Sequence, residues 1–205
     1  MIAMKESYFD KHASTWGSDR RNRRTIHIYE QLRERMPSSG SALEIGCGNG
    51  FLASLLSRHL RHIDCIDASN EMRRAAQETL QAAGVQNVDI HEEAYLSFAN
   101  KKYDLIYSLS VFHHIPDVGQ ELRLLHSLLK DEGVFYLMDL GPVPRAFHSE
   151  FENYDGHDGF SKDTIERYLN DAGFQITDYK IVWEGHNADK NMDYYLFLAE
   201  VIKSA

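Results

Sequence analysis

The sequence predicts an α/β protein with a doubly wound, mostly parallel sheet of seven strands that ends in an antiparallel hairpin. Three observations support this fold class. Short apolar segments alternate with amphipathic helical segments from residue 41 onward. A glycine-rich turn follows the first apolar segment. The last two strand-like segments, 174–183 and 192–202, are separated by residues 184–191 alone, whereas a parallel crossover needs about a dozen residues or more.

The N-terminal part of the chain predicts two helices before the first strand. These helices cover residues 5–15 and 21–36, and apolar side chains from Ile26 to Met36 recur near helical spacing. Pro37 and the small polar residues after it end the second helix.

Strands and helices then alternate along the chain. The predicted strands cover residues 41–45, 62–66, 88–91, 103–108, 134–138, 174–183 and 192–202. The predicted helices cover residues 50–60, 69–83, 118–129 and 161–172. Ser69 and Ser161 are residue types that cap helix N-termini, while Gly84 and Gly173 suit C-terminal turns.

Composition narrows the class of protein. The 205 residues carry a formal net charge of -9 and are 43% hydrophobic, which fits an α/β domain and disfavours nucleic acid or an anionic membrane as partner. We expect no signal peptide and no membrane span, and a cytoplasmic location. Cys47 and Cys65 form no Cys-x-x-Cys pair, so a thiolate zinc cluster is not expected.

The segment from Leu43 to Gly50 carries the main functional signal. Gly46, Gly48 and Gly50 alternate directly after a short strand, where glycine lets the backbone turn sharply and lie close to a ligand. An acidic residue, Asp67, ends the next strand about 20 residues after the first glycine, a spacing that suits a ribose hydroxyl pair. These residues predict a cofactor that contains a nucleoside.

A nicotinamide cofactor is the first alternative, because Gly48 to Ala53 satisfies the pattern G-x-G-x-x-(G/A). Three features oppose it. Glu44 would place a carboxylate near a pyrophosphate, the terminal hairpin breaks the all-parallel pattern, and the chain after Ile90 leaves no room for a second, catalytic domain.

Four segments together resemble the class I S-adenosylmethionine-dependent methyltransferases, in the small-molecule branch similar to ubiquinone and menaquinone biosynthesis enzymes. The segment 44–50 is similar to E/D-x-G-x-G-x-G, and 66–72 to V-D-x-S-x-x-M. The segment 103–108, followed by His113-His114, is similar to F-D-x-V-x-S…H-H. The resemblance covers about residues 40 to 202. It implies a Rossmann-like methyltransferase domain, residues 39–205. The two helices ahead of this domain predict an N-terminal helical cap, residues 1–38.

The resemblance implies S-adenosylmethionine as cofactor and S-adenosylhomocysteine as product. The residues expected to contact the cofactor are Glu44, Gly46, Cys47, Gly48, Asp67, Ala68, Met72, Glu93, Ala94, Ser108 and Trp16. Asp67 would accept hydrogen bonds from the ribose, and Ala68 and Met72 would pack on adenine. Glu93 would meet the adenine amino group, with Glu92 as the alternative.

His114 is the predicted catalytic residue, because it follows the fourth strand, at the edge where such sheets bind ligands. It could act as a base or position the acceptor, and the alternative is a structural histidine. His148 and His157 are expected at the surface. No metal site is predicted, because the donors between His148 and Asp158 lack a repeated ligand spacing.

Residues 141–160 form a connection too long for a simple loop and contain several aromatic residues. Together with Tyr8, Phe9 and Trp16 they could cover the site, or only attach the N-terminal helices to the sheet. Both interpretations stay open.

The substrate is predicted to be a small molecule. Ser108 to Val111 stands where nucleic-acid amino-methyltransferases carry D/N-P-P-Y/F, and that motif is missing. An oxygen, nitrogen or carbon acceptor is possible. The alternatives are a protein or peptide methyltransferase and a non-catalytic cofactor-binding subunit, and the oligomeric state stays open.

Overall fold

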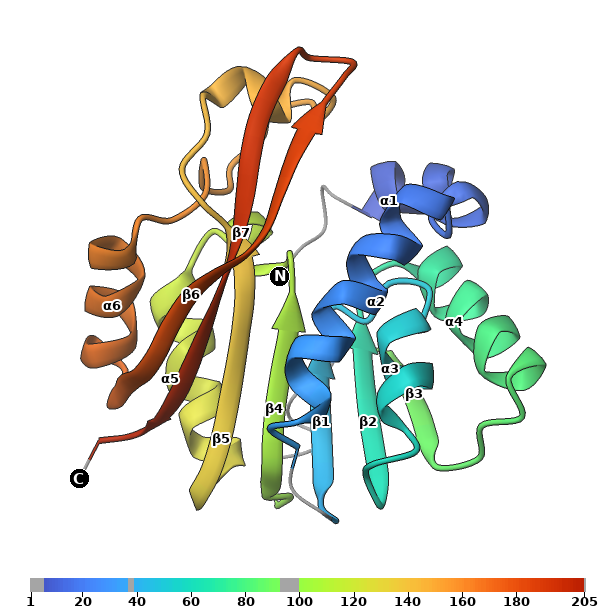
Figure 1. Ribbon diagram of the computed structural model, residues 1–205, viewed down its shortest axis with the longest axis vertical. Helices are drawn as coiled ribbons and strands as arrows, with labels where there is room; N and C mark the ends of the chain where they lie inside the picture. The colour runs from blue at the N-terminus through green and yellow to red at the C-terminus, as the bar shows by residue number, and fades with distance from the viewer. Residues whose placement is uncertain (1–5, 37–38, 93–99, 205) are drawn as a thin grey trace. The chain divides into compact units, whose positions relative to one another are not determined.

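A computed structural model describes residues 6–36, 39–92 and 100–204 (Figure 1). Its strands form one seven-stranded sheet in the order β3-β2-β1-β4-β5-β7-β6, parallel except for the C-terminal strands. The predicted fold class is therefore confirmed. The chain forms two compact units, residues 1–105 and 106–205, which we describe in turn.

The first unit is a parallel α/β arrangement. Its elements are α1 (Glu6–His12), η1 (Ala13–Thr15), α2 (Asp19–Arg33), β1 (Ser41–Ile45), α3 (Phe51–Leu56), β2 (His62–Asp67), α4 (Asn70–Ala82) and β3 (Val88–Glu92). Strand β2 pairs in parallel with both β1 and β3. Ile28 and Leu32 of α2 are fully buried, and α2 packs against α3 (Figure 1).

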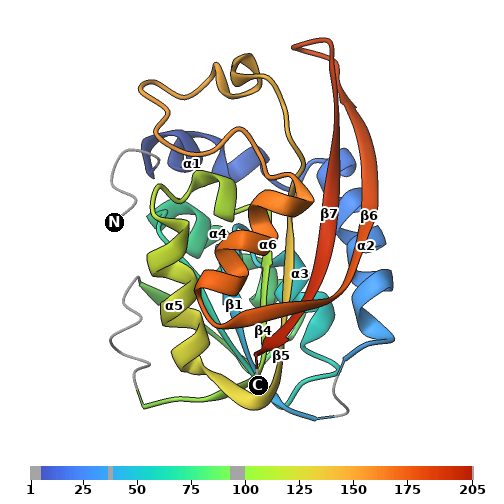
Figure 2. The same cartoon turned by 90° about the vertical axis from the view of Figure 1, so that its left-hand side faces the viewer.

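The second unit is built around an antiparallel ending. Its elements are η3 (Phe112–His114), α5 (Val118–Leu128), β5 (Leu129–Leu140), η4 (Arg145–His148), α6 (Lys162–Asp171), β6 (Phe174–Asn187) and β7 (Met192–Lys203), while β4 (Tyr103–Leu109) runs across the boundary between the units. Strand β7 pairs antiparallel with both β5 and β6. Figure 2 shows α6 beside the long β6–β7 hairpin. The predicted hairpin is confirmed.

Several predicted boundaries were wrong. Strand β6 continues to Asn187, because cross-strand pairs such as His186 with Asp193 extend the ladder beyond Trp183. Strand β5 begins at Leu129, directly after α5, and not at Val134. The predicted helix 5–15 divides into α1 and the short η1. Across the described ranges, none of the helices has both the length and the apolar character to cross a bilayer.

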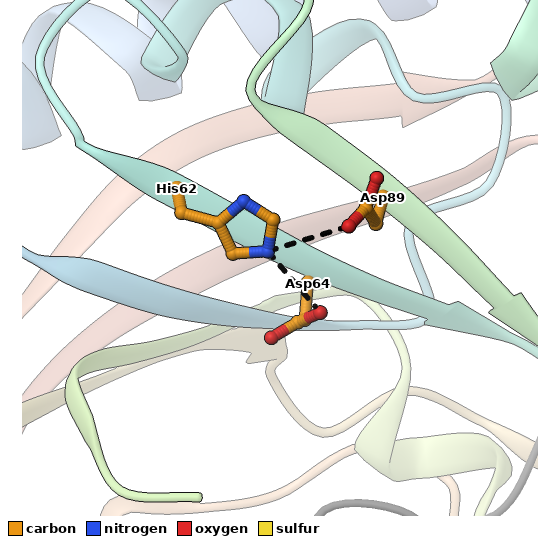
Figure 3. Close-up of side chains that lie close together, drawn as sticks. All are labelled: His62, Asp64 and Asp89. Atoms are coloured by element: carbon orange, nitrogen blue, oxygen red, sulfur yellow. Dashed lines mark hydrogen bonds and ion pairs between the residues drawn. The ribbon is translucent and has the colours of Figure 1, made fainter.

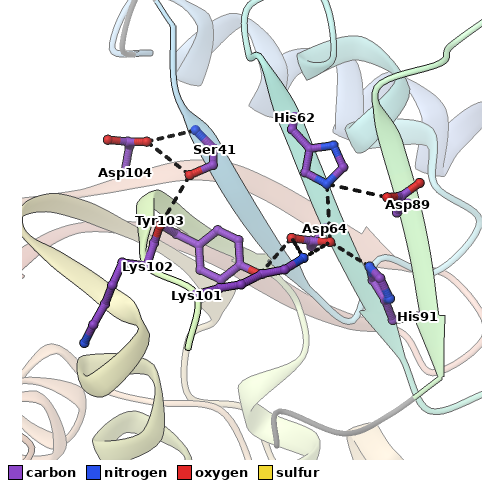
Figure 4. Close-up of polar contacts among 9 residues, drawn as sticks. All are labelled: Ser41, His62, Asp64, Asp89, His91, Lys101, Lys102, Tyr103 and Asp104. Atoms are coloured by element: carbon purple, nitrogen blue, oxygen red, sulfur yellow. Dashed lines mark hydrogen bonds and ion pairs between the residues drawn. The ribbon is translucent and has the colours of Figure 1, made fainter. Parts of the chain in front are cut away.

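A buried carboxylate anchors the strands of the first unit. Asp64 of β2 is 1% exposed. Its oxygens accept hydrogen bonds from Lys101 Nζ at 2.8 and 3.0 Å and from the Tyr103 hydroxyl at 2.8 Å. His91 of β3 lies 2.6 Å away through Nε2, and His62 lies 3.3 Å away. Asp64 therefore holds β3 and the start of β4 against β2 (Figure 4).

His62 also reaches a second carboxylate. Its Nε2 lies 3.7 Å from Asp89 of β3, so the ring sits between Asp64 and Asp89 (Figure 3). The two aspartates face each other in the β2–β3 register. Asp89 is 65% exposed, so its ion pair is screened by water and contributes little.

The hydrogen bonds around Asp64 determine its protonation. Burial by itself raises the pKa of this carboxyl, but the hydrogen bonds from Lys101, Tyr103, His91 and His62 outweigh that effect and lower the pKa to about 2. A carboxyl whose folded-state pKa lies below its unfolded value stabilises the fold above that unfolded value. The contribution is lost as the pH falls toward the folded-state pKa.

We expect Asp64→Asn to remove part of the acid sensitivity of the protein. The shift of the Asp64 pKa from 3.8 to about 2 corresponds to about 2 kcal/mol of unfolding free energy, present above pH 4 and lost toward pH 2. In urea unfolding from pH 7 to pH 2, the stability difference between wild type and variant should shrink by this amount. Asp89→Asn, an exposed control on the neighbouring strand, should follow wild type. A stability difference for Asp64→Asn that stays constant with pH would contradict this account.

Candidate functional site

The loop after β1 is held at the end of β2 in a conformation that only glycine adopts readily. Gly46, Gly48 and Gly50 have φ angles of 66°, 53° and 71°, all in the left-handed region. The N–H groups of Gly46 and Cys47 both donate to the Ile66 carbonyl, at 2.7 and 3.1 Å. The alternating glycines are therefore a backbone requirement of this turn.

Gly50 is also restricted by space. A Cβ atom at this position would lie 2.9 Å from the Ala76 Cβ of α4. The loop therefore passes directly over α4, and α3 begins immediately after it at Phe51. This close approach explains why glycine is needed at the helix start.

Asp67 connects the loop to the next helix. Its Oδ2 accepts a hydrogen bond from Gly48 N–H at 2.7 Å, and its Oδ1 accepts one from Ser69 N–H at 2.9 Å. Burial raises the pKa of this carboxyl, while the two hydrogen bonds and the nearby Arg73 guanidinium oppose the shift. The structure thus brings Asp67 and the glycine loop together, as the spacing in the sequence predicts.

Glu44 lies beneath the loop. It is 2% exposed, and its Oε2 accepts a hydrogen bond from the Cys65 thiol at 3.5 Å. Burial raises the pKa of the Cys65 thiol well above its usual value, and the pKa of Cys47 is also raised. Both thiols therefore stay protonated at neutral pH, which makes them poor nucleophiles and poor metal ligands.

The N-terminal segment lies against the loop and the start of α4. Asp10 of α1 accepts hydrogen bonds from the Ser69 hydroxyl and from Glu71 N–H, the latter at 3.3 Å. Trp16 places its Nε1 3.4 Å from where a Cβ of Gly48 would be. The Arg21 guanidinium lies 4.1 Å from the centre of the Trp16 ring. Trp16, predicted as a cofactor contact, therefore lies beside the glycine loop.

The remaining predicted cofactor residues of the first unit differ in position. Ala68 is partly exposed next to Asp67, whereas Met72 is 1% exposed within α4. Glu93 and Ala94 lie outside the described residues. Glu92 is 82% exposed and pairs with Arg73 at 3.3 Å.

In the second unit, a buried aspartate holds the histidine-containing turn η3. Asp139 of β5 is fully buried and accepts hydrogen bonds from the backbone N–H groups of Phe112 and His113, at 2.7 and 3.3 Å. Its Oδ1 lies 2.5 Å from Nδ1 of the His113 ring. Asp139 was not predicted as a site residue, although it is a single acidic residue within the apolar stretch 134–140.

The predicted catalytic residue, His114, belongs to a cluster of rings. Its ring centre lies 4.0 Å from that of His113, 5.1 Å from Phe151 and 5.8 Å from Tyr154. The Tyr154 hydroxyl donates to the His113 carbonyl at 2.6 Å. His114 is partly exposed.

The expectation that His148 lies at the surface was wrong. The residue is 3% exposed, and its ring stacks on Tyr154 at 4.2 Å between centres. Burial, followed by the nearby His113, lowers the pKa of His148 to about 4. Within the described ranges, no hydrogen-bond partner reaches its buried Nε2. At neutral pH the His148 ring is therefore uncharged.

The segment 141–160, which contains η4, is fixed by two basic side chains. Arg145 donates to the Gly156 carbonyl and contacts Asp158, both at 3.1 Å. Lys190, from the turn between β6 and β7, contacts the Phe147 carbonyl and Glu150. The segment is thus a folded part of the second unit. Ser108, a predicted cofactor contact, lies in β4. It is fully buried, and its hydroxyl contacts no polar atom of the described residues.

One group of three donor atoms converges among the described residues, and it is not in the segment 148–158. His62, Asp64 and Asp89 place their donor atoms within 4.8 Å of one another (Figure 3). Lys101 and Tyr103 already bind the Asp64 oxygens, and the lysine charge opposes a metal ion there. The arrangement fits a structural hydrogen-bond network.

Comparison with known proteins places the chain among methyltransferases. The model of a family described as "Methyltransferase domain" matches residues 17–179. The resemblance predicted from the sequence is therefore confirmed.

Two relatives carry the name ubiquinone biosynthesis O-methyltransferase. The one from Xanthomonas axonopodis pv. citri is 29% identical over 114 residues, which are 54% of this chain and 47% of the relative. The one from Actinobacillus pleuropneumoniae serotype 5b is 24% identical over 153 residues, 68% of this chain and 65% of the relative. The chain thus spans about half to two thirds of the length of these relatives.

A solved structure, the DhpI–SAH complex, has a similar fold. It superposes with a TM-score of 0.75 and 18% identity, covering 99% of this chain and 97% of that one.

We expect Asp10→Ala to loosen the N-terminal segment. The substitution removes the acceptor for Ser69 and Glu71, so amide exchange in residues 6–18 should accelerate by roughly 5- to 10-fold, the effect of one hydrogen bond of about 1 kcal/mol. Exchange in β1 should not change. Asp19→Ala, an exposed control in α2, should leave residues 6–18 as in wild type. Unchanged exchange in Asp10→Ala would mean that other contacts hold the segment.

Proposed function

The chain belongs to the methyltransferase-domain family, and we propose that it is an enzyme that transfers a methyl group from S-adenosylmethionine to a small-molecule acceptor. The names of the relatives and the bound SAH of the DhpI structure support this proposal. The observation that carries it is the pairing of the left-handed glycine loop with Asp67.

The residues present fit this cofactor. Each oxygen of Asp67 accepts one hydrogen bond from the protein, and a carboxylate oxygen can accept more than one. Asp67 can therefore also receive the hydroxyl groups of a ribose. A Cβ at Gly48 would lie 3.4 Å from Trp16 Nε1, so glycine lets the indole lie close to the loop backbone.

In our proposal, the backbone of Gly46, Cys47 and Gly48 borders the methionine part of the cofactor, with Glu44 supporting the loop from below and Trp16 beside it. Ala68 borders the adenine, and Met72 supports that contact from within α4. Glu93, Ala94 and Ser108 keep their predicted roles as cofactor contacts. When bound, S-adenosylmethionine supplies a methyl group that its sulfonium already activates, so the protein contributes mainly alignment.

The methyl acceptor is less closely defined by the structure than the cofactor is. We propose His114 as a residue that contacts the acceptor, since it lies among the rings of Phe151 and Tyr154. Aromatic rings favour a flat or apolar acceptor. A peptide acceptor and a non-catalytic binding role remain the alternatives, and transfer to metabolites in a screen with labelled methyl donor distinguishes them.

We further propose that residues 1–38 act as a cap on the methyltransferase domain, residues 39–205. Asp10 of α1 binds the start of α4, and Trp16 lies beside Gly48 of the glycine loop. The net charge of -9 supports an acceptor other than nucleic acid. Two reduced cysteines favour a cytoplasmic location.

We expect Asp67→Ala to weaken binding of S-adenosylmethionine by about 1.5–3 kcal/mol, the scale of hydrogen bonds to a charged group. Calorimetric titration measures this change, and circular dichroism verifies the fold. Asp89→Ala removes an exposed carboxylate from the same unit and should bind as wild type. If folded Asp67→Ala retains the wild-type dissociation constant, Asp67 does not hold the ribose.

A further inference from the structure

The sheet of the second unit ends in a long strand with one open edge. Strand β6 pairs with β7 along one side, and no other strand of the described ranges pairs with it (Figure 1). Its 14 residues make it longer than most strands. The backbone N–H and C=O groups along the outer side of such a strand are available to a further strand. This edge is therefore a candidate interaction surface.

Two irregularities limit the part of the edge that can pair. The β6–β7 register shifts between Ile176 and Asp178, and again between Ile181 and Trp183. A bulge bends a strand and interrupts its regular pattern of hydrogen bonds. Between the two shifts, the four consecutive residues 178–181 pair regularly with β7. A further strand can therefore pair with β6 along residues 178–181.

This regular stretch carries an exposed apolar side chain. Ile181 is 53% exposed, and Ile26 is the other large apolar residue of the described ranges that is exposed. Alternation along the strand places Ile181 on the same face as Tyr179. The Tyr179 ring stacks on Phe197 of β7 and lies 5.7 Å from Lys162 Nζ of α6. A strand added at the open edge would cover Ile181.

Two opposite charges lie on the other face of the same stretch. Asp178 and Lys180 are two residues apart, so their side chains point to one face. Asp178 also lies directly opposite Glu200 of β7, and like charges in directly opposite positions destabilise a sheet. A positive charge on the open side of Asp178 offsets that repulsion.

The order of these charges indicates which partner fits the edge. Directly opposite residues of a sheet share a face, so two antiparallel copies of β6 related by a two-fold axis normal to the sheet must be centred on one residue. A centre at Tyr179 places Asp178 of each copy opposite Lys180 of the other. A centre at Asp178 or Lys180 brings like charges together, as does parallel pairing in register. A centre at Ile181 places Asp178 opposite Glu184.

We propose that the chain forms a homodimer in which β6 pairs antiparallel with β6 of a second copy, centred on Tyr179. Two crossed pairs of Asp178 with Lys180 set the register. Ile181 of each copy lies diagonal to Tyr179 of the other, a position within reach of an aromatic side chain. The sheet of the second unit then continues from one copy into the next. This proposal does not depend on methyl transfer.

The first test follows the oligomeric state of the full chain and the exchange of its amides with concentration. Sedimentation velocity from about 2 to 200 µM, a range that suits a small and transient interface, should show a monomer that converts reversibly to a dimer. Over the same range, hydrogen exchange should slow at amides within residues 178–181 and not in the turn 188–191. A chain that stays monomeric throughout would overturn the proposal, as would a dimer that leaves exchange in 178–181 unchanged.

The second test exchanges the charges. Asp178→Lys and Lys180→Asp each bring like charges together in both crossed pairs, so each variant should dimerise roughly 10-fold more weakly than wild type. An equimolar mixture of the two variants should form a heterodimer with about the wild-type affinity, because every charge at the interface then faces its opposite. The variant that carries both substitutions should dimerise by itself for the same reason.

Glu184→Lys is the matched control, since it changes an exposed charge of β6 outside residues 178–181, and it should dimerise as wild type. Circular dichroism verifies that each variant is folded. Dimers that persist in both single variants would place the interface elsewhere. Single variants that do not recover the dimer when mixed, or a tighter dimer in Glu184→Lys, would contradict the centre at Tyr179. Each of these results overturns the proposal.

Discussion

The hydrogen bond between Gly48 N–H and the Asp67 carboxylate, 2.7 Å long, is the contact on which the glycine loop and its surroundings depend. It joins a loop that leaves β1 to a residue that ends β2, and the same carboxylate reaches Ser69 at the start of α4. Left-handed glycines make the loop possible, and the absence of a side chain at Gly50 lets it pass over Ala76. One acidic side chain thus fixes the loop, the strand end and the helix start together.

A second buried carboxylate organises the other unit in a comparable manner. Asp139 holds three backbone N–H groups and one imidazole, so the turn η3 and the strand β5 keep a fixed relation. Asp64 does the same for β2, β3 and β4, but its oxygens are satisfied by Lys101 and Tyr103 (Figure 4). The two networks differ in their donors: the Asp64 oxygens bind the side chains of Lys101 and Tyr103, whereas the Asp139 oxygens bind mainly backbone N–H groups.

Most of the fold could be predicted from local patterns. Alternating strands and helices, the glycine loop and a short connection before the last strand lead to the parallel sheet and its antiparallel ending. Boundaries were harder, because β6 extends to Asn187 through cross-strand pairs with polar residues of β7 that no local periodicity reveals. The start of β5 at Leu129 was also missed, because charged residues and a glycine interrupt the apolar pattern between Leu129 and Val134.

The candidate site, like the fold, could be predicted from the sequence only in part. Asp67 could be placed beside the glycines because both lie at ends of neighbouring strands. Asp139 and His148 could not, because their importance comes from burial and from partners distant in sequence. A histidine in a polar loop gives no sign in the sequence that it will stack on Tyr154 inside the protein. The N-terminal contact through Asp10 is likewise a tertiary feature, since Ser69 lies far along the chain.

The central claim is that the glycine loop and Asp67 form a site for S-adenosylmethionine and not for a dinucleotide. Isothermal titration calorimetry of the full chain with S-adenosylmethionine, S-adenosylhomocysteine and NAD tests it most directly. The account predicts one site that binds the first two ligands competitively and does not bind NAD. Two results would contradict it. One is binding of NAD in place of S-adenosylmethionine, and the other is a folded protein that binds neither S-adenosylmethionine nor S-adenosylhomocysteine.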